Sequence, residues 1–283
     1  MRGSLSRSIG AAMLACAVAA CSTDVSTGPG LGVTDREIDR AIATDAGDAM
    51  ATSVDLMLAD ESASGASGSV VLAPGASADV SSSAVTVTCG GPDDDGWFTC
   101  DRTTWRGLDV TRRIRFWEGT SLGTGWDPAA TDSVNHRVTI EGSFTPALAP
   151  NKTVWVHRAD TASMVVDRSG DPVLHVWSRV GVRADSATYA TAGTTRTFHY
   201  TVHDTASAVA FAMPRADHPW PMSGTVTHAI TTLFTATDGR RDISRTVTRR
   251  AMVTFDGTST VPLDVGDLTC QLDLATHDVS NCQ

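Results

Sequence analysis

One short string in the chain matches a pattern of nucleophilic hydrolases. Gly119, Ser121 and Gly123 stand in the order G-x-S-x-G, which in α/β-hydrolases places a serine on a sharp turn between a strand and a helix. A run with strand character precedes the string, but residues 124–128 (TGWDP) follow it, and this pattern does not start a helix. We therefore expect a Gly-rich loop, and a hydrolase function rests on this string alone.

Two further clusters contain residue types that bind metals. His175 and His203 fall on the polar side of neighbouring predicted strands, where a cross-strand pair is able to share an ion. Histidines on a wet sheet face are more often plain surface residues. Asp93, Asp94 and Asp95 are consecutive, whereas calcium loops alternate their acids so that the side chains converge. The sequence therefore predicts no metal and no cofactor, and a solvated turn at the three acids.

The clearest local pattern is a long hairpin in residues 222–255. Its two β-patterned runs meet at Asp238 and Gly239, a preferred pair for a two-residue hairpin loop. Such a loop places Phe234 opposite Ile243 on one apolar face, because side chains alternate along a strand. The same count pairs, on that face, Ile230 with Val247, Val226 with Ala251, Gly224 with Val253 and Met222 with Phe255. The other face carries mostly Thr, Ser and charged residues and suits water.

Charged and titratable side chains interrupt the apolar face of this hairpin. The predicted register places His228 opposite Arg249 and Thr232 opposite Arg245. Buried unpaired charge is costly, so the arginines either pair with acids of a preceding helix or line a partly wet cavity for an amphipathic or anionic ligand, unless the register is wrong here. The helix acids considered are Asp45, Asp48 and Asp55. His228, Arg245 and Arg249 are accordingly the predicted ligand-binding residues.

Four cysteines in the main part of the chain predict two local disulfides. Cys89 and Cys100 flank one predicted turn, and Cys270 and Cys282 flank another. Three pairings are possible, and pairing within each hairpin needs the least rearrangement of the chain. A loop of roughly ten residues closed in this way stabilises a fold by about 2–3 kcal/mol. A four-cysteine zinc site is the competing interpretation, but neither pair has the C-x-x-C spacing.

The start of the chain has the composition of a secretory signal peptide. Arg2 and Arg7 flank a short polar start, and residues 9–20 form an apolar run of small residues. This run is too short to span a bilayer as a mature helix. An exported chain also meets the oxidising conditions in which disulfides persist. We expect residues 1–20 to be removed as a signal peptide.

The signal peptide ends in the string Val18-Ala19-Ala20-Cys21. The string resembles the lipobox of bacterial lipoproteins, which has an aliphatic residue three positions before an invariant Cys and small residues between them. The resemblance implies cleavage before Cys21, acylation of its thiol and new amine, and anchoring of the exported chain in the cell envelope. Ser22 follows Cys21, and a Ser in this position resembles the lipoproteins that two-membrane bacteria send to the outer membrane. The competing expectation is a soluble secreted protein cut after an Ala-x-Ala site.

The charge balance argues against several partners. Asp and Glu total 32 against 22 Lys and Arg, which is a net charge of −10 at pH 7. An acidic protein is a poor general binder of nucleic acid or of anionic membrane surfaces. We therefore expect no nucleic-acid partner, and contact with a membrane through acyl chains on Cys21 and not through charge.

The chain from Cys21 onward predicts a tether, one helix and many strands. Residues 21–33 have the composition of a flexible tether, and Thr34 and Glu37 form a capping box. Apolar residues then recur at helical spacing and predict one amphipathic helix over about 35–58. From residue 84 onward, apolar and polar residues alternate in runs separated by turn signals.

Strands with one apolar face and no helices between them predict an antiparallel sheet. In the run 174–183, for example, Leu174, Val176, Val180 and Val182 are expected on the core side. We predict one mainly β domain over 34–283, built as a large curved antiparallel meander. It is either a half-barrel with the helix in its concave face or a two-sheet sandwich with the helix at one end. The half-barrel layout resembles the periplasmic lipoprotein carriers.

Three functions follow from these patterns. The sequence contains no P-loop, H-E-x-x-H, S-x-x-K or dinucleotide fingerprint. The leading expectation is a lipid-anchored cell-envelope lipoprotein with a non-enzymatic structural or interaction role, with another envelope protein as its partner. The second is an envelope binding module that holds an amphipathic or lipid-like ligand between helix and sheet. The third is the hydrolase suggested by Ser121.

Overall fold

The computed structural model describes residues 32–61, 69–72, 85–105, 107–125, 127, 129–144, 153–168, 174–191, 193–213 and 217–283. Leu31–Gln283 form one compact unit. The predicted signal peptide and Cys21 lie outside the described residues.

One helix, α1 (Asp35–Glu61), opens this unit and begins at the predicted capping box. The backbone N–H of Glu37 donates to the Thr34 hydroxyl (3.2 Å), and the Glu37 carboxylate accepts from the Thr34 N–H (2.8 Å). Within the described residues, no helix is long and apolar enough to cross a membrane. The apolar side of α1 is fully buried at Ile38, Ile42, Ala46, Met50 and Val54.

The described strands form a single antiparallel sheet of fifteen strands. They are β1 (Ser69–Leu72), β2 (Val85–Pro92), β3 (Phe98–Cys100), β4 (Thr103–Trp105), β5 (Leu108–Glu118), β6 (Ser121–Leu122), β7 (Ser133–Phe144), β8 (Thr153–Asp167), β9 (Leu174–Thr191), β10 (Thr194–Ala212), β11 (Ser223–Thr237), β12 (Asp242–Thr254), β13 (Thr260–Val265), β14 (Leu268–Asp273) and β15 (Val279–Ser280). Neighbours follow chain order, except that β4 and β6 pair only with β5. The predicted meander is confirmed.

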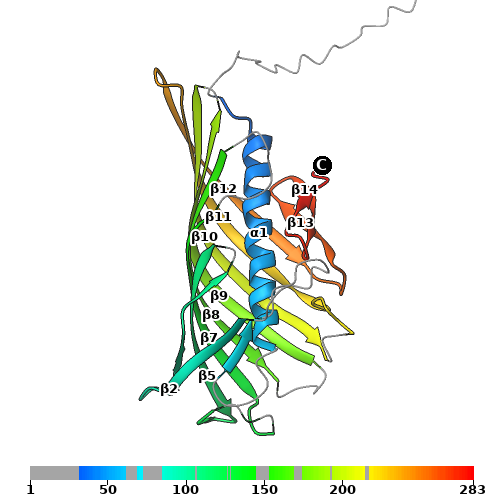
Figure 1. Ribbon diagram of the computed structural model, residues 1–283. Coiled ribbons are helices and arrows are strands. Elements are labelled where there is room, and N and C mark those ends of the chain that lie inside the picture. The colour runs from blue at the N-terminus through cyan, green and yellow to red at the C-terminus, as the bar shows by residue number, and fades with distance from the viewer. Residues whose placement is uncertain are drawn as a thin grey trace, which may run out of the picture. The chain divides into compact units, whose positions relative to one another are not determined.

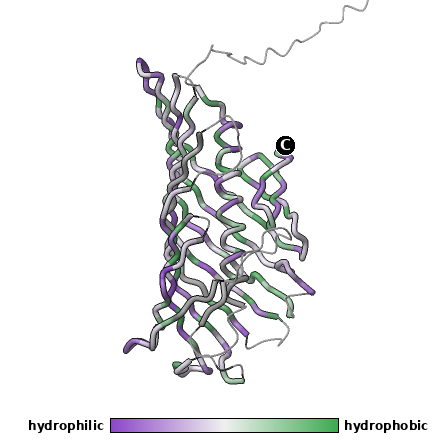
Figure 2. The backbone as a smooth tube through the Cα atoms, in the orientation of Figure 1, coloured by the Kyte–Doolittle hydropathy of each residue, from purple (hydrophilic) through white to green (hydrophobic). Residues whose placement is uncertain are grey.

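The sheet curves around α1, with the long strands β7 to β12 on one side of the helix and β13 and β14 on the other (Figure 1). Hydrophobic and hydrophilic residues alternate along the strands (Figure 2), and the buried apolar residues of the strands form one core with those of α1. Because all strands belong to one hydrogen-bonded sheet, the curved open sheet with a central helix is observed and not the two-sheet sandwich.

A glycine in the middle of α1 allows the helix to lie close to the sheet. A Cβ atom at Gly47 would lie 2.4 Å from Val279 Cγ2 and 3.3 Å from Leu272 Cδ1. Gly inside a helix costs about 1 kcal/mol relative to Ala, and here it lets α1 pack directly against β14 and β15. At this point the helix is therefore in direct contact with the concave side of the sheet.

Both predicted disulfides are present. Cys89 bonds to Cys100 across β2 and β3, and Cys270 bonds to Cys282 between β14 and the C-terminal segment. The second bridge holds the end of the chain beside β14, where Thr269 and Gln283 exchange backbone hydrogen bonds.

The predicted register of the β11–β12 hairpin is wrong by two residues. Thr237 pairs with Asp242 and Phe234 with Arg245, so the loop spans residues 238–241. The reason is the Asp238 carboxylate, which accepts hydrogen bonds from the N–H groups of Arg240 (2.9 Å) and Arg241 (2.8 Å) and closes a longer turn. A shift of two leaves every side chain on its predicted face, because the strand period is two.

The predicted faces of β9 are reversed. Val180 and Val182 are 66% and 52% exposed on the outer face, whereas Arg179 and Arg183 are buried on the side of α1. If apolar character alone decided burial, the valines would face α1 and the arginines would face water. The arginines are stabilised inside because acids of α1 and β10 reach them, which a single strand does not reveal.

Candidate functional site

The hairpin arginines pair with the helix, as one of the two explanations for them requires. Arg249 Nε donates to the Asp39 carboxylate (2.6 Å), and Arg245 forms an ion pair with Asp35. Their partners are therefore two acids of the first turns of α1, and not Asp45, Asp48 or Asp55. The three acids named as examples were wrong for these arginines, because Asp45 pairs with Arg183, and Asp48 and Asp55 pair with His277.

His228 is offset by two residues from the position opposite Arg249 in the register. It is 1% exposed, pairs in register with Asp204 of β10 and Ala251 of β12, and does not face Arg249 directly. Arg245, by contrast, is 44% exposed at the side chain. The three residues predicted to bind a ligand thus differ in their exposure and in their partners.

A buried ionic cluster joins α1 to β9 and β10. Arg183 Nη1 donates to Asp45 (2.9 Å) and to Asp185, and these side chains are only 2%, 7% and 0% exposed. Arg179 Nε donates to Asp204 (2.5 Å), and both are buried. Burial, with Asp45 nearby, raises the pKa of the Tyr200 hydroxyl well above its usual value. This cluster was not predicted, although charged residues at 179, 183 and 185, on one face of a strand, are its signal in the sequence.

A histidine clamps the other side of α1. His277, in the segment between β14 and β15, contacts Asp48 through Nδ1 (3.3 Å) and Asp55 through Nε2 (2.9 Å). Burial alone lowers the pKa of His277, but the hydrogen bonds and negative charges of the two aspartates outweigh it and raise the pKa above 6.5. Protonated His277 therefore stabilises the packing of the C-terminal segment against the helix.

This clamp predicts a pH dependence of stability. Because the pKa of His277 is higher in the folded chain than in the unfolded one, its contribution is complete below about pH 6.5 and is lost as pH rises through the folded-state value. We expect His277→Asn to lower the free energy of unfolding by about 1.5–3 kcal/mol at pH 6, because it removes hydrogen bonds made by a charged group, and by less at pH 9. Asn tolerates the backbone φ of 65° at this position.

The measurement is urea unfolding at several pH values. An equal deficit of the Asn variant at pH 6 and pH 9 would contradict a charged clamp. Thr276→Ala, at the exposed neighbouring position, serves as the control with an unchanged pH profile.

The G-x-S-x-G string does not form a nucleophile elbow. Ser121 is exposed in the short strand β6, which folds straight back onto β5 through the pairs Glu118–Ser121 and Trp117–Leu122. The next element of the described chain is the strand β7, not a helix. The strand-to-helix turn that the chemistry needs is therefore not observed at this serine.

The residues considered for metals do not converge. His175 is buried toward the helix side and accepts from Arg168, whereas His203 is exposed on the outer face, so the expected shared face is wrong. Asp93 accepts hydrogen bonds from the N–H groups of Trp97 and Asp95, which lower its pKa and shape a turn. In the part of the chain that the structure describes, no group of three metal-binding side chains occurs.

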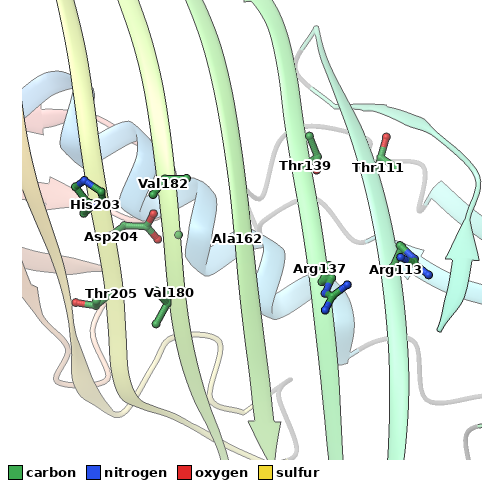
Figure 3. A pocket seen from close by; sticks show the side chains of 11 residues that line it. Thr111, Arg113, Arg137, Thr139, Ala162, Val180, Val182, His203, Asp204 and Thr205 are labelled. Carbon is green, nitrogen blue, oxygen red and sulfur yellow. The ribbon is translucent and has the colours of Figure 1, made fainter. Parts of the chain in front are cut away.

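An open groove with a volume of about 520 Å³ crosses the outer face of the sheet. Two in-register rows of side chains form it. Its lining includes Thr111 and Arg113 of β5, Thr139 and Arg137 of β7, Val180 and Val182 of β9, and His203 and Thr205 of β10. Figure 3 shows the arginines at one end and the valines and His203 toward the other.

Three arginines gather over one tryptophan at the basic end of this groove. The guanidinium carbon of Arg137 lies 4.3 Å from the ring centre of Trp97, and those of Arg113 and Arg115 lie 5.5 Å and 4.6 Å from it. Trp97 is only 4% exposed beneath them. Arg113 also pairs with Asp93, whereas no described acid pairs with Arg137. Positive charge thus gathers here on a chain that is acidic overall.

Comparison with protein-family models, with curated proteins and with solved structures finds no match to this chain. The groove and the ionic cluster are therefore interpreted from their own chemistry.

Proposed function

We propose that this protein is an exported, lipid-anchored protein of the cell envelope with a non-enzymatic interaction role, and that the outer face of its sheet is the interaction surface. The observation that carries the proposal is the packing of α1. The helix occupies the concave side of the sheet with its apolar residues and with ion pairs to Arg183, Arg249 and His277.

The same packing favours the outer face over the space between helix and sheet. A carrier that holds its ligand against the concave face must leave room there, whereas Gly47 brings α1 into direct contact with Val279 and Leu272. The groove on the outer face is open, because Val180 and Val182 are more than half exposed. We therefore keep ligand binding as the alternative function, with the ligand on the outer face of the sheet and not between helix and sheet.

The anchor is proposed from the string that ends at Cys21. In a bacterial host that acylates lipoproteins, we expect the protein in the membrane fraction and an N-terminal peptide that begins at Cys21 and carries acyl chains. In a two-membrane host the outer membrane is expected, because Ser22 follows Cys21. Mass spectrometry of the N-terminal peptide and fractionation of the envelope are the measurements.

Cys21→Ser is the matched variant for this test. It removes the acylation site and changes no described residue, so we expect the folded chain to leave the membrane fraction almost completely, since we propose that the acyl chains, and not charge, hold this acidic protein to the bilayer. A wild-type N-terminus that starts at another residue without acyl chains would contradict the anchor and would favour a soluble secreted protein.

A further inference from the structure

We propose that the outer-face groove binds an anionic amphiphile, with its phosphate or carboxylate group at Arg137 and Arg113 and its apolar part across Val180 and Val182. This inference rests on the proposed non-enzymatic binding role, but it does not depend on acylation of Cys21. It assigns a chemical class of ligand to the groove.

The first argument is the arginine pair itself. Arg113 and Arg137 are direct cross-strand neighbours in the β5–β7 register. Like charges in that position destabilise a sheet, and Asp93 offsets only one of the two. Trp97 holds Arg137 from below, and no described acid neutralises it. An anionic group that binds here supplies the missing negative charge, and a guanidinium suits phosphate or carboxylate geometry.

The second argument is the apolar part of the groove. Val180 follows Arg137 two strands further along one row, with β8 between them. Strands are spaced by about 4.8 Å, so the valines begin about 10 Å from the anion site. At 66% and 52% exposure, Val180 and Val182 are unusually open for apolar residues in the middle of a sheet. An alkyl chain that covers the two valines removes both its own apolar surface and theirs from water.

The third argument excludes other modes of recognition. The groove runs across central strands, whose backbone groups are engaged in the sheet, so an added peptide strand has no edge to pair with here. Trp97 is covered by arginines and does not present its ring for stacking against a sugar. Asp204 also lines the groove, but it is 3% exposed and its charge is paired with Arg179.

The test uses the full chain with Cys21→Ser, so that no acyl chain of its own competes for the groove. Octyl phosphate, inorganic phosphate and octyl glucoside are titrated separately by calorimetry. Inorganic phosphate has the anion without the alkyl chain, and octyl glucoside has the alkyl chain without the anion. We expect octyl phosphate to bind at least about tenfold more tightly than either. Equal binding of inorganic phosphate would overturn the amphiphile, and absence of octyl phosphate binding would overturn the site.

Two variants locate the binding. Arg137→Gln is expected to weaken octyl phosphate about tenfold or more, because it removes a charged hydrogen-bonding group. Arg240→Gln removes the same charge at the exposed tip of the β11–β12 hairpin and is expected to change nothing. Equal losses in the two variants would show a nonspecific charge effect and overturn the proposal.

The double variant Val180→Thr, Val182→Thr keeps the side-chain shape and is expected to weaken octyl phosphate, while inorganic phosphate is unaffected. An unchanged octyl phosphate affinity would remove the valines from the site and overturn the amphiphile. Release of inorganic phosphate from octyl phosphate would contradict the non-enzymatic role and leave the binding site standing. If Cys21 is acylated but octyl phosphate does not bind, the lipid anchor is supported and the proposed ligand site is wrong.

Discussion

Replacement of Arg183 by methionine is expected to lower the free energy of unfolding by about 3–5 kcal/mol, because it leaves buried carboxylates without their cation. Arg183 bonds both Asp45 of α1 and Asp185 of its own strand, and all three side chains are nearly inaccessible to water. Methionine fills a similar volume with apolar atoms, so the loss reports the charge and not a cavity. Urea unfolding is the measurement.

Arg241→Met is the matched control for this variant. Arg241 also forms an ion pair, with Asp238 in the hairpin loop, but its side chain is 69% exposed. Exposed pairs contribute at most about 1 kcal/mol. Adding Asp185→Asn to Arg183→Met should recover part of the loss, since one of the two buried negative charges is then removed. Equal losses for Arg183→Met and Arg241→Met would contradict a buried ionic cluster.

Replacement of Gly224 by alanine is the second change expected to lower the free energy of unfolding strongly. Gly224, in β11, has a φ of +101°, and a Cβ atom there would lie 2.4 Å from the Ala208 carbonyl oxygen and 2.6 Å from Val209 Cα. The crowding arises at the bulge of β10 between Ser207 and Ala210, where Ala208 also has a positive φ. Because backbone atoms are unable to move aside as side chains do, we expect a loss of about 3–5 kcal/mol.

Gly239→Ala separates strain from steric conflict. Gly239 has a comparable φ of +78°, but nothing lies within 4 Å of its Cβ position. Only the conformational cost of about 1–2 kcal/mol is expected there. Thermal or urea unfolding of both variants gives the comparison. If Gly224→Ala cost no more than Gly239→Ala, the close contact of the β10 and β11 backbones would be contradicted.

Local patterns predicted most of the fold. The capping box at Thr34 and Glu37 marked the start of α1, and the alternation of apolar residues marked the strands of the meander. Both depend on contacts within a few residues, which a sequence displays directly. The disulfides were predictable for the same reason, since each joins cysteines in neighbouring strands or segments separated by 11 or 12 positions.

The candidate site was less predictable. Val180 and Val182 were expected in the core, yet they line the outer groove, because Arg179 and Arg183, which flank them on β9, have partners on other elements. Arg113 and Arg137 belong to different strands, and the sequence offers no sign that they stand side by side. The hairpin arginines did pair with helix acids, but which acids they reach depended on how α1 packs against β12, which the sequence does not display.

The sequence by itself determined which segments become helix and strand, that the strands join as an antiparallel meander, and where a lipobox-like string stands. Only the tertiary structure decided which face of β9 is buried, which acids of α1 meet which basic residues, and that an arginine pair lies beside two exposed valines. The physical reason is that hydrogen bonding and side-chain alternation are set by near neighbours, whereas the stability of a buried charge depends on a partner far away in the chain. Asp45 and Arg183, separated by 138 positions, are the clearest instance.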